Sequence, residues 1–330
     1  MTAPQNFKSF VGNRRVVDIL RRAVDQGRLP HALIFAGPSG VGKRTLALLL
    51  AQHLNCIRPE RDEPCGVCNA CRKISGGTHP DVRVVEPDGA FIKIDQVRAM
   101  IDEVAYQPFE GKYRMVILDG ADQMRVEAAN CLLKTLEEPP SRSVLVLVTA
   151  KPYLLLGTIR SRSRLLQFGP IAEDDIEAFL IGTEGRPPDD ARLAASFSNG
   201  SLSMATAFDP ARHKEVRALA LRFVSMLLRR EGFAQASALG SGIAKDKELF
   251  LVWLDMAATL LQDVYYAQTA PARIGQRDIA RELAGLAQSA PRARVLGAIE
   301  AVKNLRSGLL QNVNRQLALE ALFLAETARS

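Results

Sequence analysis

The sequence has no apolar run long enough to cross a membrane. Its longest apolar stretch, residues 249–261, is interrupted by Asp255 and falls short of the roughly 20 residues that a spanning helix needs. The first ten residues are polar and contain no apolar core of the kind that marks a secretion signal. These absences argue against a membrane or secreted protein, and we expect a cytoplasmic one.

Cysteine is scarce, and most of it lies in one short segment. Four of the five cysteines are Cys56, Cys65, Cys68 and Cys71. In a cytosolic chain, such crowding favours metal binding over disulfides. The two C-x2-C steps let one loop present sulfur ligands to a tetrahedral Zn²⁺ ion, with no position left for water. We predict a structural zinc site. Four free thiols or an iron–sulfur cluster are the alternatives, although the C-x3-C-P continuation of ferredoxins is missing.

The charge balance is basic but not extreme. The chain has 43 lysines and arginines against 36 acidic residues, which gives a net charge of +7 and a pI near 9.3. Such a surplus permits contact with nucleic acid but does not require it. At 330 residues the chain is long enough for two or three domains.

The first half of the chain alternates short apolar runs with helical patterns. We predict strands at residues 32–36, 82–85, 115–118, 144–149 and 165–168, and helices at 43–54, 95–104 and 126–137. Nearly all residues of these strands are apolar, as in strands covered on both faces. The alternation therefore predicts a parallel sheet with crossover helices.

After Gly169 and Pro170 the pattern becomes entirely helical. We expect helices near residues 216–229, 248–268, 279–288 and 292–328. The predicted fold class is α/β followed by all-α. Its predicted domains are an α/β domain over residues 1–170, a small helical domain over 171–209 and a larger helical domain over 210–330.

A phosphate-binding pattern follows the first predicted strand. Residues 37–43 fit G-x-x-x-x-G-K, with Gly37, Gly42 and Lys43 at its fixed positions and Gly40 within it. Glycines let backbone N–H groups approach phosphate oxygens at the start of a helix, and the lysine neutralises phosphate charge. The alternative is a glycine-rich turn without a ligand, but the strand, the helix and the lysine all favour a P-loop.

The position after Lys43 departs from this pattern. A Ser or Thr hydroxyl there normally ligates Mg²⁺, but the residue is Arg44, and Thr45 comes one position late. A one-residue shift rotates a side chain by about 100° around a helix. We therefore predict impaired Mg²⁺ binding; the alternative is that water or another side chain replaces the missing ligand.

A second departure follows the strand at residues 115–118. Asp119 ends this strand as the acid of a Walker B pattern and is a candidate Mg²⁺ ligand. The next residue, Gly120, has no side chain that could activate water. We expect Asp122 to be a helix cap or a surface acid, and the alternative is that it substitutes as the catalyst. The candidate nucleotide-binding residues are Gly37, Gly40, Gly42, Lys43, Thr45 and Asp119.

A short basic segment, Thr158-Ile159-Arg160-Ser161-Arg162-Ser163, follows the fourth predicted strand. On its own it is typical of a solvated loop. A rigidly held arginine at the edge of an α/β domain can also reach into a neighbour's active site and stabilise phosphoryl transfer.

Several segments together resemble one family, the delta-prime subunits of the clamp loader of bacterial DNA polymerase III. They are the four-cysteine insertion, His31-Ala32-Leu33-Ile34-Phe35, the run from Asn130 to Pro140 that contains LLKTLEEPP, Ser161-Arg162-Ser163, and a C-terminal pattern that begins at Asn312. The likeness extends over essentially the whole chain.

This resemblance implies an AAA+ fold with a zinc insertion, a helical lid over residues 171–209 and an oligomerisation collar over 210–330. It implies that Arg162 acts in trans at the ATP site of a gamma or tau subunit, and that Ser203 replaces a nucleotide-sensing arginine. The implied partners are gamma or tau, delta, the sliding clamp and primed DNA. Polymerase activity would lie in another subunit, and this chain's own ATPase would be absent or weak, with ATP or ADP held without hydrolysis.

Two other functions remain open from the sequence. An active AAA+ ATPase of the gamma or tau kind would use the intact loop and Asp119. A zinc-bearing DNA-binding module would use the basic charge and the cysteine cluster. The sequence does not decide whether nucleotide occupies the loop, what the subunit stoichiometry is, or whether this chain touches DNA.

Overall fold

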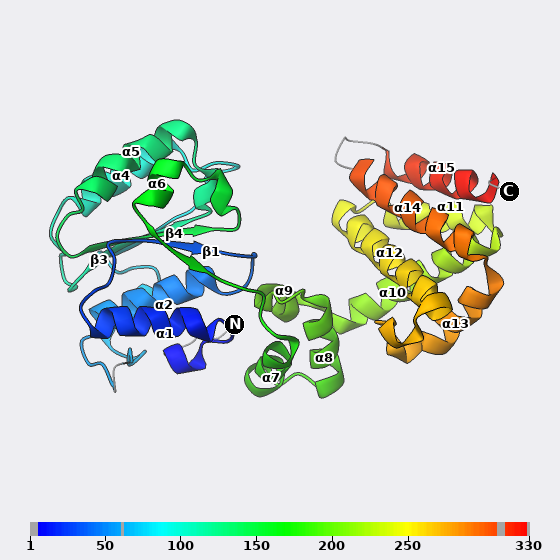
Figure 1. Cartoon of the computed structure of the whole chain (residues 1–330), viewed down its shortest axis with the longest axis horizontal. Helices are drawn as coiled ribbons and strands as arrows, with labels where there is room; N and C mark the ends of the chain where they lie inside the picture. Colours follow the sequence, from blue (N-terminus) through cyan, green and yellow to red (C-terminus); the bar gives the residue numbers. More distant parts are fainter. Residues whose placement is uncertain (1–5, 61–62, 309–313, 329–330) are drawn as a thin grey trace. The chain divides into compact units, whose positions relative to one another are not determined.

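The chain divides at residue 208 into two compact units (Figure 1). The computed structural model describes residues 6–60, 63–308 and 314–328. The first unit combines a sheet with helices and includes the segment predicted as a separate domain over 171–209, whereas the second unit is helical. Within the described ranges, no helix has the length and apolar character needed to span a bilayer.

The first unit is built on five parallel strands in the order β2-β3-β4-β1-β5. The strands are β1 (Ala32–Ala36), β2 (Val82–Val85), β3 (Arg114–Asp119), β4 (Ser143–Thr149) and β5 (Arg164–Gln167). Both ends of every strand lie within one residue of the prediction. The predicted fold class, α/β followed by all-α, is thus confirmed.

Helices cover both faces of this sheet (Figure 1). Helices α1 (Arg14–Asp25) and α2 (Lys43–Asn55) lie on one face, and α4 (Ile94–Val104), α5 (Val126–Glu137) and α6 (Gly157–Ser161) lie on the other. Alternate residues of β1 enter the two cores, Leu33 and Phe35 on the α2 side and Ile34 on the α5 side. Burial on both faces explains why the strands are continuously apolar.

Three helices after β5 extend the core on the α2 side. They are α7 (Glu173–Glu184), α8 (Pro188–Phe197) and α9 (Leu202–Ala207). Their buried side chains, among them Ile176, Leu180 and Ala205, belong to the same apolar cluster as Phe10 and Phe168. This segment therefore packs against the sheet domain.

The second unit contains six α-helices in its described residues. They are α10 (Pro210–Arg229), α11 (Phe233–Ile243), α12 (Lys247–Thr269), α13 (Ala280–Ser289), α14 (Arg292–Gly308) and α15 (Arg315–Ala328). Helix α12 buries Phe250 and Trp253, and the Trp253 ring packs edge-on against Phe223 of α10 with their centroids 4.9 Å apart.

One expectation for this unit was wrong, and one helix was missed. The single helix predicted over residues 292–328 is two helices, α14 and α15, and residues 309–313 of that prediction lie outside the described residues. Helix α11 is not expected from its sequence, because Gly240 and Gly242 lower helix propensity. Leu319 of α15 packs so closely on Gly240 that an added Cβ would lie 2.6 Å from it. Tertiary packing therefore stabilises this helix despite the low helix propensity of its two glycines.

A buried carboxylate holds the turn that leads into β3. Asp81 accepts hydrogen bonds from the backbone N–H groups of Phe109, Glu110 and Gly111 at 2.6–2.8 Å. Its carboxylate also pairs with the Arg114 guanidinium at 2.8 Å. Burial acts to raise the pKa of Asp81, but these hydrogen bonds lower it to about 2. The ionised form is therefore a structural element of this turn.

We predict that Asp81→Asn destabilises the first unit by about 2 kcal/mol, since a two-unit pKa shift corresponds to roughly that free energy. Because the folded pKa is depressed, the contribution is complete above the ordinary value of 3.8 and is lost as the pH falls toward about 2. Denaturant unfolding at several pH values measures both effects. Asp88→Asn is the control, since its ion pair with Lys93 is exposed and is worth about 1 kcal/mol or less. Equal losses in the two variants would contradict the assignment.

Candidate functional site

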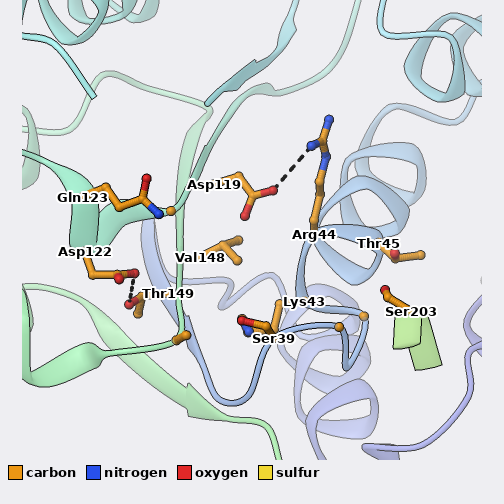
Figure 2. Close-up of a pocket in the computed structure, with 14 residues that line it drawn as sticks. Ser39, Lys43, Arg44, Thr45, Asp119, Asp122, Gln123, Val148, Thr149 and Ser203 are labelled. Atoms are coloured by element: carbon orange, nitrogen blue, oxygen red, sulfur yellow. Dashed lines mark hydrogen bonds and ion pairs between the residues drawn. The ribbon is translucent and has the colours of Figure 1, made fainter. Parts of the chain in front are cut away.

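A cavity of about 410 Å³ opens where β1, β3 and β4 end (Figure 2). The carboxyl ends of parallel strands meet at one edge of a sheet, which is where such folds bind ligands. The cavity is lined by Ser39, Gly40, Gly42, Lys43, Arg44, Thr45, Asp119, Gly120, Asp122, Gln123, Val148, Thr149, Ala150 and Ser203. The structure thus brings together the predicted nucleotide-binding residues, with Gly37 at the base of the loop.

The glycines of the loop are required by close contacts and by backbone conformation. Gly40 has a φ of +77°, and an added Cβ would lie 2.0 Å from the hydroxyl oxygen of Ser201. The backbone N–H of Ser203 donates to the Gly40 carbonyl at 3.2 Å. Helix α9 therefore rests directly on the phosphate-binding loop.

Lys43 is the first residue of α2 and is almost fully buried. Its ammonium group donates to the loop's own carbonyls, Gly37 at 2.7 Å and Pro38 at 2.6 Å. Burial lowers the pKa of Lys43, and the nearby Asp119 and Asp122 carboxylates oppose that shift. The lysine thus stands between the loop backbone and two acids, beside the space that a phosphate group would fill.

Arg44 takes the place next to the Walker B acid. Its guanidinium lies 3.4 Å from Asp119 Oδ2 and also pairs with Glu86, which directly follows β2. Figure 2 shows Arg44 extending toward Asp119, while the Thr45 side chain points away from it. Burial raises the pKa of Asp119, and the positive charge of Arg44 opposes this shift. The arginine therefore supplies the charge that partly neutralises Asp119.

Two contributors to this site were missed from the sequence, and one was misjudged. Thr149, at the end of β4, donates its hydroxyl to Asp122 at 2.6 Å and accepts from the Lys151 N–H at 2.9 Å. Asp122, expected to be a cap or surface acid, instead lines the cavity. Glu86 was also overlooked. The available signal was a polar residue at the carboxyl end of an apolar strand, which fits both Thr149 and Glu86.

Arg162 lies away from this cavity. It follows α6, on the face of the sheet opposite α2, and is not among the described residues that line the cavity. Its side chain is 37% exposed and pairs with Glu137 at the end of α5 at 2.7 Å. It also donates to the carbonyl of Thr158 at 3.2 Å. The structure therefore separates this arginine from the chain's own phosphate-binding loop.

The four predicted cysteines form one compact cluster. Their sulfur atoms all lie within 4.8 Å of one another, and none forms a disulfide. Cys56 Sγ lies 3.6 Å from Cys65 Sγ and 4.0 Å from Cys68 Sγ. Sulfurs bound to one tetrahedral Zn²⁺ at about 2.3 Å are about 3.8 Å apart. The donor set and spacing therefore suit zinc, with every ligand position filled by sulfur.

The cluster is anchored at the far end of α2. Cys56 directly follows this helix, and the Gln52 amide donates to the Cys71 carbonyl at 3.2 Å. On the other side, the carboxylate of Glu63 accepts the Phe7 backbone N–H at 2.7 Å. The cysteine segment is thus tied both to the helix that carries Lys43 and to the start of the described chain.

Comparison with known proteins supports a single family. Residues 12–172 match the family described as DNA polymerase III, delta subunit, and residues 219–327 match the one described as its C terminal part. The delta-prime subunit of DNA polymerase III from Bacillus subtilis is 34% identical over 94% of both chains. That from Pseudomonas aeruginosa is 33% identical over 89% of this chain and 90% of its own. The Bacillus subtilis tau subunit is 36% identical over only 52% of this chain and 31% of its own. The chain therefore belongs to the family of DNA polymerase III delta-prime subunits.

Proposed function

We propose that this chain is a non-hydrolysing subunit of the sliding-clamp loader of the replicative DNA polymerase. In this role it organises a complex with gamma or tau and delta subunits, which acts on the clamp and primed DNA. It also donates Arg162 to the ATP site of a neighbouring gamma or tau subunit. The observation that carries the proposal is the contact between Arg44 and Asp119, which removes the acid from its usual role as a metal ligand.

The chain's own site has little that could drive hydrolysis. Gly120 cannot activate water, and the hydroxyl of Thr149 already bonds to Asp122, the next acid along the chain. Phosphoryl transfer depends on a metal ion and a positioned nucleophile, and neither is provided for among these residues. We infer that any bound ATP or ADP stays unreacted here.

The placement of Arg162 suits a role in another subunit. The side chain is partly exposed, and its ion pair with Glu137 joins two solvent-accessible groups. An exposed pair of this kind is worth about 1 kcal/mol or less. The arginine can therefore exchange this partner for a phosphate group of a neighbouring subunit at small cost.

An active ATPase of the gamma or tau kind is the second candidate. Its support is the phosphate-binding loop itself and the 36% identity of about half the chain to a tau subunit. We predict that the isolated chain hydrolyses ATP no faster than its Lys43→Ala variant, because Lys43 is the residue on which loop-dependent hydrolysis would rely. A steady-state assay of the two proteins decides this. A wild-type rate that the substitution abolishes would establish the ATPase and overturn the non-hydrolysing role.

We predict that Arg162→Ala impairs the assembled clamp loader. An arginine finger accelerates phosphoryl transfer by roughly 10³–10⁵-fold. ATP hydrolysis should therefore be lost at the site that this chain completes and continue at the other ATP sites. ATP hydrolysis and clamp loading are measured on primed DNA after gel filtration has shown that the complex assembles. Arg160→Ala, two residues away and also exposed, is the matched control. Undiminished hydrolysis and loading with Arg162→Ala would exclude the trans role.

For the cysteine cluster we propose one structural Zn²⁺ held by Cys56, Cys65, Cys68 and Cys71. With four thiolates bound, the ion would offer no position for water or substrate, and its contribution would be to cross-link the segment that follows α2.

Removing this metal with a chelator should lower the free energy of unfolding of the first unit by a few kcal/mol, because metal binding contributes directly to folding. Calorimetry, together with metal analysis showing one zinc per chain, measures this. Cys68→Ser should reproduce the loss, whereas Cys131→Ser, outside the cluster, should not. An unchanged thermal midpoint in the metal-free chain would refute the structural role.

A further inference from the structure

The fold implies an Mg²⁺ ion beside a nucleotide, but the residues of this cavity do not suit one. The hydroxyl that would ligate the ion is replaced by Arg44, and the Thr45 side chain points away from Asp119 (Figure 2). The carboxylate of Asp119, the remaining candidate ligand, faces the Arg44 guanidinium at 3.4 Å. A divalent cation at this carboxylate would lie against a permanent positive charge, which repels it.

Arg44 itself carries the chemistry that phosphate groups require. A guanidinium presents five N–H donors in a planar fork that matches phosphate oxygens, and it keeps its charge at every physiological pH. Its side chain is 44% exposed and pairs with two acids, Glu86 and Asp119, that also have solvent access. The pair with the exposed Glu86 is weak, so the guanidinium can turn part of its fork of donors to a ligand while it stays beside Asp119.

The position of Arg44 places this charge beside the phosphate-binding loop. It is the second residue of α2, directly after Lys43, and both residues line the 410 Å³ cavity. The start of α2 adds the favourable field and free N–H groups of a helix N-terminus. Two fixed cations and a helix end thus converge on one cavity.

We propose that Arg44 takes the place of Mg²⁺, so that the cavity binds a nucleoside di- or triphosphate that carries no divalent metal. Lys43 and the loop backbone hold the phosphate groups, and the Arg44 guanidinium neutralises the charge that the metal neutralises in related sites. The cavity binds free nucleotide more tightly than its magnesium complex, for two reasons. The metal of the complex would lie close to Arg44, which repels it, and it would neutralise phosphate charge that otherwise attracts Lys43 and Arg44. This inference rests on the proposed absence of hydrolysis, since no metal is then needed for chemistry.

The test is binding of ADP to the isolated, zinc-loaded full-length chain by calorimetry, once in buffer without Mg²⁺ or chelator and once with excess Mg²⁺. Wild-type chain should bind ADP at least as tightly without Mg²⁺ as with it. In Arg44→Thr the hydroxyl returns and the repelling charge is gone, so adding Mg²⁺ should tighten binding by about tenfold, the equivalent of one charge-assisted contact. Arg98→Thr, an exposed substitution on α4, should behave like wild type.

A second readout does not depend on affinity. Mn²⁺ added with ADP and followed by electron paramagnetic resonance should show a protein-bound ion in Arg44→Thr and none in wild type. Thermal midpoints of all variants show that they are folded, and Arg44→Lys, which keeps the charge, should retain binding without Mg²⁺.

Two results would overturn the proposal. One is wild-type binding that needs Mg²⁺, and the other is no wild-type binding of ADP under either condition. Neither result bears on Arg162, whose trans role is measured in the assembled complex. Failure of this inference is therefore distinguishable from failure of the proposed function.

Discussion

The buried helix α2 is the constraint on which both candidate sites depend. Its first residue is Lys43 of the phosphate-binding loop, and Cys56 of the sulfur cluster directly follows its last residue. Nine of its 13 residues are buried, most of the apolar ones in the core that it shares with the sheet and with α7 to α9. Thirteen helical residues span about 20 Å, so the helix links two distant sites as a rigid rod. The cysteine cluster adjoins one end of the helix. At that end Gln52 donates to the Cys71 carbonyl, and the side-chain oxygen of Asn55 accepts the backbone N–H groups of Lys112 and Tyr113. These contacts help to hold the helix that carries the phosphate-binding loop at its other end.

The sheet of the first unit could be predicted almost residue by residue, and the physical reason is its burial. Strands covered on both faces, such as β1 with Phe35, must be continuously apolar, and such runs stand out from helices that show an exposed polar face. The phosphate-binding loop and the cysteine cluster were equally visible, because their residues are neighbours in the chain. Glu86 and Thr149 were not, because they reach the site only through the strand order β2-β3-β4-β1. That order is not readable from the pattern of any single strand.

The helical unit was harder to predict for a related reason. Its long helices follow from periodicity, and α12 was found within one residue at each end. Helix α11 contains two glycines, which disfavour helix, and its Gly240 admits Leu319 of α15 at close range. A contact between residues so far apart in sequence leaves no local signature. The separation of α14 from α15 did have a local signal that was overlooked. Gly308 disfavours helix, and Asn314 accepts the backbone N–H groups of Gln316 and Leu317 at the start of α15.

Three arginine–carboxylate pairs of the first unit differ in burial, and burial determines what each arginine can do. Arg114 with the fully buried Asp81 is a structural pair, because separating it would leave a charge without solvent or partner. Arg162 with Glu137 is exposed on both sides, so water can replace either partner and the arginine is available to another molecule. Arg44 is intermediate, since Asp119 is only 28% exposed while Glu86 is 53% exposed. Lys43 is a second cation near Asp119, so Arg44 compensates only part of the charge of this acid, and a phosphate ligand would compete for the guanidinium. The same functional group thus serves as scaffold, as an internal counter-ion or as a group open to solvent, according to how much water reaches its partner.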